Sequence, residues 1–508
     1  MVARGPWSLL APPLPLSAAP ADARPMPRRA RPVIDPRILV GDCRDRLPEL
    51  ADSSIDAMVT DPPSGTHYGD HAWDRFGSDD ENGSATPEAL ASYRSFLTAA
   101  FREAYRALKP GAYAIVWAFP RTCHHTMTAL EDAGFDVRDV ITHHFATGNP
   151  KSRCPGEWVD RSPSADAEEW GTFVTAGRKR ARMSREALAD RLGGGVTALR
   201  VAEWERGLRL PTSPERRRLA KLLRSEGYVT SAAREWEGWG TALKPATEFW
   251  VVARKPLEDG DLGNNALRWG TGAMPVHAVR TGVDGSLAED GRWPTNLVMT
   301  HAPGCEITGH TKVKTPVPTA RSREWGASGG ANNWGRGREV GRGDARTPSM
   351  ETVPVWSCEE GCPVQLIESQ SGRDGTSRYF PAFRPEPGDA INALVRFIDK
   401  TGGRERPVVA SAPRHPTPKA LPLMRWLVRL VTPPGGLVLD PFLGSGATAE
   451  AALMEGFDWV GCEVADGRDG RPDYISLVQA RVERFERGES PGQPALGPAA
   501  GRERRRGR

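Results

Sequence analysis

The chain has 508 residues, of which 39% are apolar and 26% charged, so it is long enough for two or three domains and ordinary in composition for a globular protein. Its net charge of +4 does not by itself indicate a nucleic-acid partner, and because no apolar run approaches the roughly 20 residues of a membrane span, we expect no membrane association. Seven scattered cysteines, an odd number, exclude a disulfide framework and suit the reducing cytoplasm of a bacterial or phage-infected cell.

Residues 1–34 predict a disordered leader. The moderately apolar stretch at 7–16 is too short, and too often interrupted by proline, for a secretory signal. The Arg- and Pro-rich residues 24–32 continue the same unfolded composition.

Strands and helices alternate from residue 35 to residue 150. Apolar runs and helical periodicity predict strands at 37–42, 54–60, 112–118 and 135–144, and helices at 87–108 and 121–132. The second strand must end at Asp61-Pro62-Pro63, because proline cannot donate to a sheet, and the polar residues 65–86 predict a loop. Lys109-Pro110-Gly111 is read as a break before the third strand. The alternation predicts a parallel α/β sheet.

The pattern changes twice in the middle of the chain. From about residue 149 to residue 238 aliphatic residues thin out and arginines accumulate, which indicates an insertion. An apolar strand at 248–253, within the segment 238–256, returns the chain to the sheet. Residues 257–380 are rich in Gly and Arg and weakly periodic, which is typical of an irregular functional region.

The last third of the chain returns to alternating elements. Strands are predicted at 436–440 and 458–463, and helices at 420–431, after the glycine loop through Met454, and at 474–487. The Gly-, Pro- and Arg-rich residues 488–508 predict a disordered tail.

A glycine loop, Asp440-Pro-Phe-Leu-Gly-Ser-Gly-Ala-Thr448, joins a strand to a helix. Its glycines let the backbone approach a ligand, and the helix N-terminus offers free N–H groups. The next strand ends at Glu463, where nucleoside-binding folds place an acid that accepts hydrogen bonds from a ribose diol. The dinucleotide fingerprint fails at Ala449 and the phosphate-loop Gly-Lys-Ser/Thr is absent. A nucleoside site is therefore favoured over a tight turn without a ligand.

The turn Asp61-Pro62-Pro63-Ser64 suits the chemistry of an exocyclic amine. The amine of adenine or cytosine is a poor nucleophile, because its lone pair is delocalised into the ring. The Asp61 carboxylate and the Pro62 carbonyl can accept its two N–H bonds, while the prolines keep both oxygens aimed. The alternative is a plain loop, since Asp-Pro pairs are common in turns. The glycine loop in the same chain favours the catalytic interpretation.

These motifs resemble the DNA N6-adenine and N4-cytosine methyltransferases in the permuted, β-class arrangement, where the catalytic turn precedes a target-recognition region and the glycine loop comes last. The resemblance covers about residues 35–150 and 238–487. It is also carried by Gly41-Asp42 and His415-Pro-Thr-Pro-Lys419. Three further segments are similar to phage- and prophage-type members: Trp239–Ala246, Arg292–Asn296 and Ser377–Pro381.

The resemblance implies an α/β, Rossmann-like fold that binds S-adenosylmethionine on a seven-stranded mixed sheet with one antiparallel strand. It implies a catalytic half at 35–150, a target-recognition region at 257–380 and a cofactor-binding half at 405–487. It also implies double-stranded DNA as partner, a target base flipped out of the duplex and, as in many relatives, a homodimer. The implied catalytic residues are Asp61, Pro62, Pro63 and Ser64, and the implied cofactor-binding residues are Asp42, Lys419, Asp440, Phe442, Gly444, Ser445, Gly446, Thr448 and Glu463.

Two positions depart from the family's pattern. Ser64 stands where the family has a Tyr or Phe that stacks on the flipped base, and losing such stacking costs on the order of 1–3 kcal/mol. Tyr68 or Trp73 in the adjoining loop can supply a ring, so we expect Ser64→Tyr to be tolerated or to improve activity. Ala420 replaces the usual proline after Lys419. An Asp at the head of the turn favours N6-adenine within this family, with N4-cytosine as the close alternative.

The insertion contains a basic helical segment. Residues 178–224 hold 14 Lys or Arg against 5 Asp or Glu. The segment 172–228 is similar to phage-repressor-type helix-turn-helix domains, with Ser184 capping one helix, glycines at 193–195 ending it, and a reading helix at 197–206. Leu188 and Trp204 are predicted core residues. The implied DNA-contacting residues are Arg185, Thr197, Arg200 and Arg206. The alternative is a solvated, arginine-rich helical pair.

Two Cys- and His-containing pairs have the spacing of metal ligands, His301-x3-Cys305 and Cys358-x3-Cys362. Four such ligands can hold a structural zinc ion, but the pairs are far apart in sequence and free cysteine is often a small buried apolar residue. The sequence leaves the metal unassigned.

A function of a different class also stays open at this level. Ser64 and the repressor-like insertion suit a DNA-binding regulator built on a decayed methyltransferase. Intact Asp61, Asp440, Gly446 and Glu463 favour an active enzyme.

Overall fold

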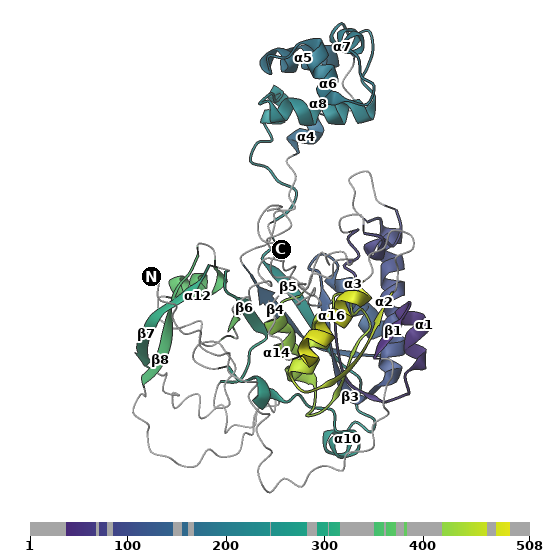
Figure 1. Ribbon diagram of the computed structural model, residues 1–508, viewed down its shortest axis with the longest axis vertical. Coiled ribbons are helices and arrows are strands. Elements are labelled where there is room, and N and C mark those ends of the chain that lie inside the picture. The colour runs from purple at the N-terminus through teal and green to yellow at the C-terminus, as the bar shows by residue number, and fades with distance from the viewer. Residues whose placement is uncertain are drawn as a thin grey trace, which may run out of the picture. The chain divides into compact units, whose positions relative to one another are not determined.

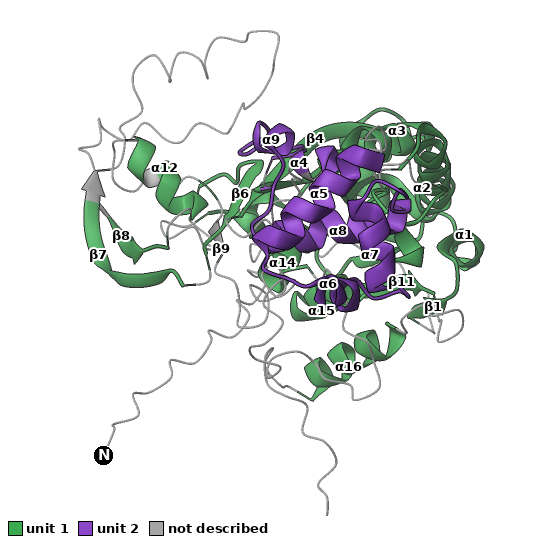
Figure 2. Ribbon diagram, turned by 90° about the horizontal axis from the view of Figure 1, so that it is seen from above, with its two compact units in different colours: residues 1–147, 246–508 green, residues 148–245 purple. Residues whose placement is uncertain are grey.

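The structure is a computed structural model, and it describes part of the chain. The described residues are 37–67, 71–78, 85–145, 155–160, 167–243, 245–281, 292–302, 304–314, 350–359, 362–371, 380, 382–383, 419–464 and 474–487. The expected leader and tail, Tyr68, and residues 415–418 therefore lie outside the described residues. The chain divides into two compact units, residues 1–147 with 246–508, and residues 148–245 (Figure 2).

The first unit is an α/β, Rossmann-like unit, and its described strands form a nine-stranded mixed sheet in the order β1-β11-β10-β2-β3-β5-β4-β6-β9. Figure 1 labels several of these strands and the helices beside them. β5 is antiparallel to both of its neighbours, and the other pairings are parallel, as predicted. The strands are β1 Ile38–Val40, β2 Ile55–Thr60, β3 Leu108–Ala118, β4 Asp136–His144, β5 Thr247–Arg254, β6 Leu297–Thr300, β9 Ala382–Phe383, β10 Leu437–Asp440 and β11 Asp458–Glu463.

The expected count of seven strands was wrong. β6 and β9 extend the sheet beyond β4, and they have only four and two residues. Runs this short carry too few side chains to show alternation in the sequence. The helix stop expected at 109–111 is confirmed, because that helix ends at Ala107, but the expected strand start at 112 was wrong, because β3 already begins at Leu108. The register between β2 and β3 shifts at this point, and an irregularity of this kind is where a strand tolerates proline.

Helices cover both faces of the sheet, which explains why its central strands are mostly apolar. Every residue of β2 and β10 is buried. Residues of β2 enter different cores: Ile55 and Met58 pack with one set of helices, and Ala57 and Val59 with the other. The first set is α1 Cys43–Arg46, α2 Pro87–Ala107 and α3 Cys123–Asp132, and the second is α14 Leu421–Val431, α15 Ala447–Met454 and α16 Ile475–Glu486.

The region expected to be irregular contains regular elements. They are α10 Leu262–Trp269, the short helix η4 Val276–Val279, β6, the antiparallel ribbon of β7 Glu306–Lys314 and β8 Met350–Ser357, and α12 Pro363–Ser371. The ribbon pairs Glu306 with Ser357, two residues that are distant in sequence, so no local sequence signal marks it. Among the described residues, no helix has the length and apolar content that crossing a bilayer demands.

The second unit is all-helical and has its own core. Its described helices are α4 Gly156–Val159, α5 Ala167–Arg180, α6 Arg185–Leu192, α7 Ala198–Glu205, α8 Ser213–Ser225 and α9 Ser231–Arg234. Leu188 and Trp204 are fully buried in this core, as predicted. Ser184 caps α6 by accepting the Ala187 N–H, as predicted, and Gly193 ends that helix with a positive φ of 62°.

The second unit interrupts the connection between two neighbouring strands of the first. β4 and β5 are antiparallel partners, with His144 opposite Thr247. One residue further along, the Phe145 N–H donates to the Ala246 carbonyl at 3.1 Å, which continues the pairing of the two strands. The chain therefore leaves and re-enters the first unit at adjacent points, as it would across a hairpin turn.

Candidate functional site

Four acidic residues lie at the carboxyl ends of neighbouring strands. Asp42 follows β1, Glu463 ends β11, Asp440 ends β10 and Asp61 follows β2. These strands are adjacent and parallel in the order β1-β11-β10-β2, so their carboxyl ends share one edge of the sheet. Ligands of open α/β sheets bind at this edge. The structure thus brings together acids from the first and last parts of the described chain.

Asp440 holds the start of the glycine loop. Its carboxylate is buried and accepts the Thr60 hydroxyl at 2.5 Å and the Phe442 N–H at 3.0 Å. Burial raises the pKa of Asp440, and hydrogen bonds from Thr448 and Thr60 oppose that rise. These contacts tie the loop to β2, which carries the catalytic turn at its end.

The glycine loop turns through backbone that only glycine adopts readily. Gly444 has φ of 51° and Gly446 of 80°, and Gly446 is the N-cap of α15. The Glu463 carboxylate accepts the Gly444 N–H at 2.6 Å, which fixes the acid beside the loop. Ser445 and Thr448 are buried in the same loop and first helical turn. The predicted cofactor-binding residues from 440 to 463 therefore form one continuous structure.

Asp42 lies next to Glu463 but already has partners. The Gly41 N–H donates to the Glu463 carbonyl at 2.9 Å, so the two chain segments are side by side. The Asp42 carboxylate caps α1 by accepting the Arg44 N–H at 2.9 Å, and it also accepts from the Arg44 guanidinium. The guanidinium lies 4.9 Å from the Phe96 ring centre, and Phe96 packs against Phe442. Arg44 and Phe96, which the sequence did not predict, thus lie beside the predicted cofactor residues Asp42 and Phe442.

Asp61 forms an ion pair that the sequence did not predict. The Lys419 ammonium lies 3.1 Å from Asp61 Oδ2 and 3.7 Å from Glu248 Oε2, and it is 3.9 Å from the Trp117 ring centre. Burial raises the pKa of Asp61 to about 6, and Lys419 limits that rise. At neutral pH the carboxylate is thus mostly ionised and able to accept hydrogen bonds. Lys419, expected to bind cofactor, contacts Asp61 of the turn predicted to be catalytic.

Glu248 is a second acid of the site, and sequence reasoning missed it. It accepts the Trp117 indole N–H at 2.7 Å and contacts His143 Nδ1 at 2.8 Å, while His143 Nε2 contacts the Thr300 hydroxyl at 2.8 Å. Although burial raises the pKa of Glu248, Lys419, His143 and Trp117 together lower it to about 2. The available signal was an acid opening an otherwise apolar strand.

Ser64, which stands where a stacking ring was expected, is instead hydrogen-bonded to a buried acid. Its hydroxyl donates to Asp74 Oδ2 at 2.7 Å, and Asp74 also accepts the N–H groups of Gly65 at 2.7 Å and Thr66 at 3.2 Å. Asp74, which the sequence did not single out, is fully buried and organises the loop after the catalytic turn. A tyrosine at position 64 would displace this carboxylate, so the structure argues against the expectation that Ser64→Tyr is tolerated.

Pro63 of the turn and Trp73, the ring expected to stack on the base, each contact another side chain. The Tyr93 hydroxyl donates to the Pro63 carbonyl at 3.0 Å, which fixes the backbone directly after Pro62. Trp73 is half-buried and stacks on His71, with ring centres 5.4 Å apart.

The four predicted DNA-contacting residues of the second unit divide into two pairs. Arg185 pairs with Glu205 at 2.6 Å, and Arg200 pairs with Glu215 at 2.9 Å, so both guanidinium groups help to hold the unit together. Thr197 caps α7 and is exposed, and Arg206 is exposed at the end of that helix. Glu205 has a lowered pKa, because Arg178 and Arg185 outweigh its burial.

One part of this site is similar to a known protein family. Residues 356–468, which contain Lys419, the glycine loop and Glu463, match the family model described as DNA methylase, of the N6/N4 type. The chain is 39% identical over 79 residues to the type II methyltransferase M.BglI of Bacillus subtilis, covering 16% of this chain and 21% of that protein. It is 32% identical over 88 residues to the type II methyltransferase M.ScaI of Streptomyces caespitosus, covering 17% and 27%.

These matches are partial. The chain spans about a quarter or less of the length of the curated relatives it matches, between 21% and 27%. Among solved structures, the PvuII DNA methyltransferase, described as cytosine-N4-specific, is similar at 12% identity and a TM-score of 0.34, over 89% of this chain and 92% of that one.

Proposed function

We propose that this chain is an S-adenosylmethionine-dependent DNA amino-methyltransferase that methylates the N6 amine of adenine. The observation that carries the proposal is the placement of Asp61 beside the glycine loop and Glu463, at the carboxyl ends of adjacent parallel strands. The DNA methylase match over 356–468 supports it for the cofactor-side half. The order of catalytic turn first and glycine loop last supports the β-class assignment.

The residues at this edge fit the chemical groups of S-adenosylmethionine. Glu463 is a half-buried carboxylate at the end of a strand, suited to accept hydrogen bonds from a ribose diol. Asp42, Phe442 and Phe96 offer a polar acceptor and apolar rings at the adenine end of such a nucleoside. When bound, this cofactor supplies a methyl group on a positively charged sulfur.

Asp61 and Pro62 hold the target amine and stabilise the charge that develops on it. The Asp61 carboxylate and the Pro62 carbonyl accept the two N–H bonds of the flipped base, which directs the nitrogen lone pair out of the ring plane. Methyl transfer would break the bond between the methyl carbon and sulfur and form one to the nitrogen, so positive charge would develop on the nitrogen until it loses a proton. The Asp61 carboxylate stabilises that charge. Lys419 holds the Asp61 side chain in position, and Glu248 in turn holds Lys419.

Adenine is proposed over cytosine because an Asp begins the turn. In the family that this chain resembles, an Asp at the head of the turn favours enzymes that methylate adenine. The N4 amine of cytosine is the alternative substrate. The amine chemistry is the same for both bases, so the residues and roles named here serve either one.

Transfer of label tests the proposal. Purified protein is incubated with methyl-labelled S-adenosylmethionine and mixed-sequence duplex DNA, and label in the DNA is counted. We expect incorporation that depends on both protein and duplex. If DNA is bound without any incorporation, the protein is a DNA-binding regulator on a methyltransferase scaffold and the proposal is wrong.

The methylation rate should fall in acid as Asp61 takes up a proton. Because the pKa of Asp61 is raised to about 6, the carboxylate that accepts the amine N–H is lost as the pH falls through that value. Lys419 lowers this pKa, so Lys419→Met should move the acid limb of the rate profile to higher pH. Single-turnover rates from about pH 5 to about pH 9 measure the limb, and Lys419→Arg, which keeps the charge, serves as the control. An acid limb that stays in place in Lys419→Met would contradict the assigned ion pair.

The second unit is proposed to be a helix-turn-helix module that adds affinity for duplex DNA. α6 and α7 are joined by glycines at 193–195, and the segment 178–224 carries an excess of nine basic residues. Thr197 and Arg206 are exposed at the two ends of α7, the helix proposed to enter the major groove. Arg185 and Arg200 are better assigned to holding the module together, through Glu205 and Glu215.

Removing the second unit should weaken duplex binding and flatten its salt dependence. Residues 148–245 can be replaced by a short glycine linker, because Phe145 and Ala246 are already hydrogen-bonded neighbours. Each phosphate that the unit neutralises adds about 0.9 to the magnitude of the slope of log affinity against log salt concentration. The shortened protein should therefore show a smaller slope. Fluorescence anisotropy with duplex DNA between low and high salt measures both effects, and thermal unfolding confirms that the first unit stays folded. Equal affinity and slope in the shortened protein would refute a DNA-binding role for the unit.

A further inference from the structure

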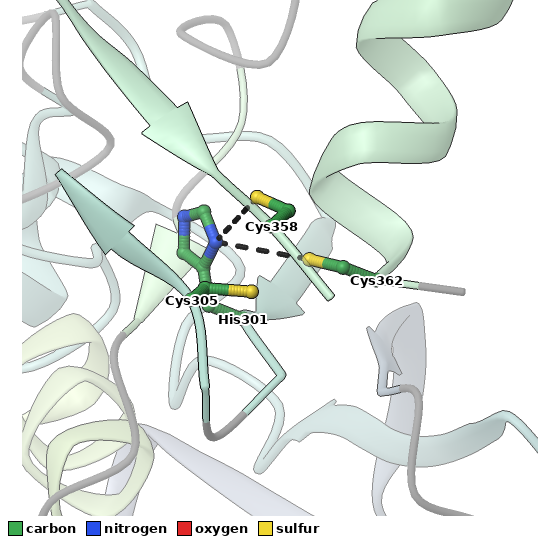
Figure 3. A group of neighbouring side chains, drawn as sticks. All are labelled: His301, Cys305, Cys358 and Cys362. Carbon is green, nitrogen blue, oxygen red and sulfur yellow. Dashed lines mark hydrogen bonds between the residues drawn. The ribbon is translucent and has the colours of Figure 1, made fainter. Parts of the chain in front are cut away.

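Four metal-ligand side chains gather where β7 begins and β8 ends, and none of them is among the acids of the sheet edge (Figure 3). They are His301, Cys305, Cys358 and Cys362, and their ligand atoms all lie within 4.8 Å of one another. His301 Nδ1 is 3.7 Å from the sulfur of Cys358 and 3.7 Å from that of Cys362. A tetrahedral zinc ion with Zn–S bonds of about 2.3 Å requires ligand separations of about 3.5–3.8 Å, so the cluster already approaches that geometry.

The secondary structure explains how ligands so distant in sequence meet. His301 directly follows β6, Cys305 directly precedes β7, Cys358 directly follows β8, and Cys362 directly precedes α12. The first residue of β7 pairs with the last residue of β8, so the ribbon brings Cys305 and Cys358 together. Each ligand thus stands at the end of a different element, and one ion would join all four elements.

The immediate surroundings suit thiolate ligands. His301, Cys305 and Cys362 are buried, and the His301 ring stacks on Trp356 with centres 3.9 Å apart, which fixes its orientation. Backbone hydrogen bonds involving Ala302, Val364 and Gln365 reach the Cys362 thiol. Backbone N–H groups aimed at a sulfur stabilise its charged form, as outer contacts do in metal sites.

The apolar core around the cluster is small. Among the described residues it consists of five buried side chains: Met299, Ala302, Cys305, Cys362 and Val364. Two of those five are cysteines of the cluster itself. A core of this size does not by itself hold a long ribbon in place, and small units of this kind gain their stability from disulfides or from a metal ion. Among the described residues, the three cysteines of the cluster form no disulfide, so all three thiols are available to a metal ion.

We propose that His301, Cys305, Cys358 and Cys362 bind one structural zinc ion that fixes the β7-β8 ribbon and α12 to strand β6 of the sheet. Three thiolates and one imidazole close a tetrahedral shell and leave no open position for a substrate, so the ion is structural and not catalytic. Since β6 is hydrogen-bonded to β4, the ion connects the ribbon to the strand that carries His143. The ribbon belongs to the region that the family resemblance assigns to target recognition.

Metal analysis of the full chain tests this proposal directly. Protein is expressed in zinc-containing medium, purified without chelator and analysed for metals by mass spectrometry. We expect about one zinc per chain, and about a tenfold or greater loss of zinc affinity in Cys358→Ser and in Cys362→Ser. Cys123→Ser, which changes a cysteine that instead donates to the Pro120 carbonyl, should keep its zinc. Wild-type protein with no zinc, as purified and after incubation with Zn²⁺, would overturn the proposal.

Cobalt substitution of the wild-type protein tests the same four ligands if the serine variants do not fold. Wild-type protein is stripped with a chelator and titrated with Co²⁺ alone. We expect the intense visible bands of tetrahedral cobalt with thiolate ligands at one equivalent, and their loss on adding Zn²⁺. Weak bands of six-coordinate cobalt, or zinc content that is unchanged in both serine variants, would show that this cluster does not hold the metal. These readouts do not depend on methylation, so they stand apart from the test of the enzyme's activity.

Discussion

Replacing Asp61 by alanine is expected to slow methyl transfer by on the order of 10³-fold, with S-adenosylmethionine binding unchanged. The substitution removes the acceptor that aims the target amine and the charge that stabilises it as the new bond forms. Both effects arise in the transition state, so the single-turnover rate should fall while the affinity for cofactor and duplex DNA stays close to that of the wild type. Single-turnover transfer to duplex DNA, together with calorimetric titration of the cofactor, measures the two separately.

Two variants sharpen this result. Asp61→Asn keeps one acceptor oxygen and the side-chain size but lacks the charge, so it should retain more activity than alanine and less than the wild type. Asp56→Ala is the matched control, because Asp56 is likewise an acid paired with a lysine, Lys109, but lies near the start of β2, whereas Asp61 follows the end of that strand. It should lower thermal stability and leave the rate per folded molecule near the wild-type value. Full activity of Asp61→Ala would refute the assigned role of the turn.

Replacing Glu463 by alanine is expected to weaken S-adenosylmethionine binding by about 100-fold, which corresponds to about 2.8 kcal/mol. The Glu463 carboxylate is held beside the glycine loop by the Gly444 N–H, in position to accept the ribose hydroxyls. Hydrogen bonds to a charged acceptor contribute about 1.5–3 kcal/mol. The dissociation constant is measured by calorimetric titration, with circular dichroism to confirm folding.

Asp458 supplies the control for that variant. It begins the same strand, β11, at the opposite end of the sheet, and its exposed side chain lies 3.9 Å from Arg37. Asp458→Ala should bind S-adenosylmethionine as the wild type does. Equal affinities for Glu463→Ala and the wild type would show that the nucleoside binds elsewhere and would remove the glycine loop from the site.

Most of the sheet could be predicted from the sequence, because its central strands are runs of mostly apolar residues bounded by Pro, Gly or Asp. The predicted bounds of β2, β10 and β11 agree with the structure to within a single position at each end. The glycine loop could be predicted for the same reason, since positive φ at Gly444 and Gly446 leaves a clear trace in the sequence. Strand bounds and the glycine loop could be predicted because residues close in sequence determine them.

The parts that could not be predicted depend on contacts between distant residues. Glu248 and Lys419 meet Asp61 only after the chain has closed the sheet, and neither position carries a local pattern that indicates the contact. Asp74 lies in a polar loop, where an acid is ordinary, until its hydrogen bonds to the turn are seen. The Cys and His pairs had ligand-like spacing in the sequence, but their convergence required the β7-β8 pairing.

Identification of the methylated nucleoside tests the central claim most directly. Duplex DNA treated with the protein and S-adenosylmethionine is digested to nucleosides and separated by liquid chromatography with mass detection. The account predicts N6-methyladenine, and N4-methylcytosine would keep the amine chemistry of Asp61 while correcting the base. Methylation on a ring carbon, or no methylated nucleoside from DNA that the protein binds, would contradict the account.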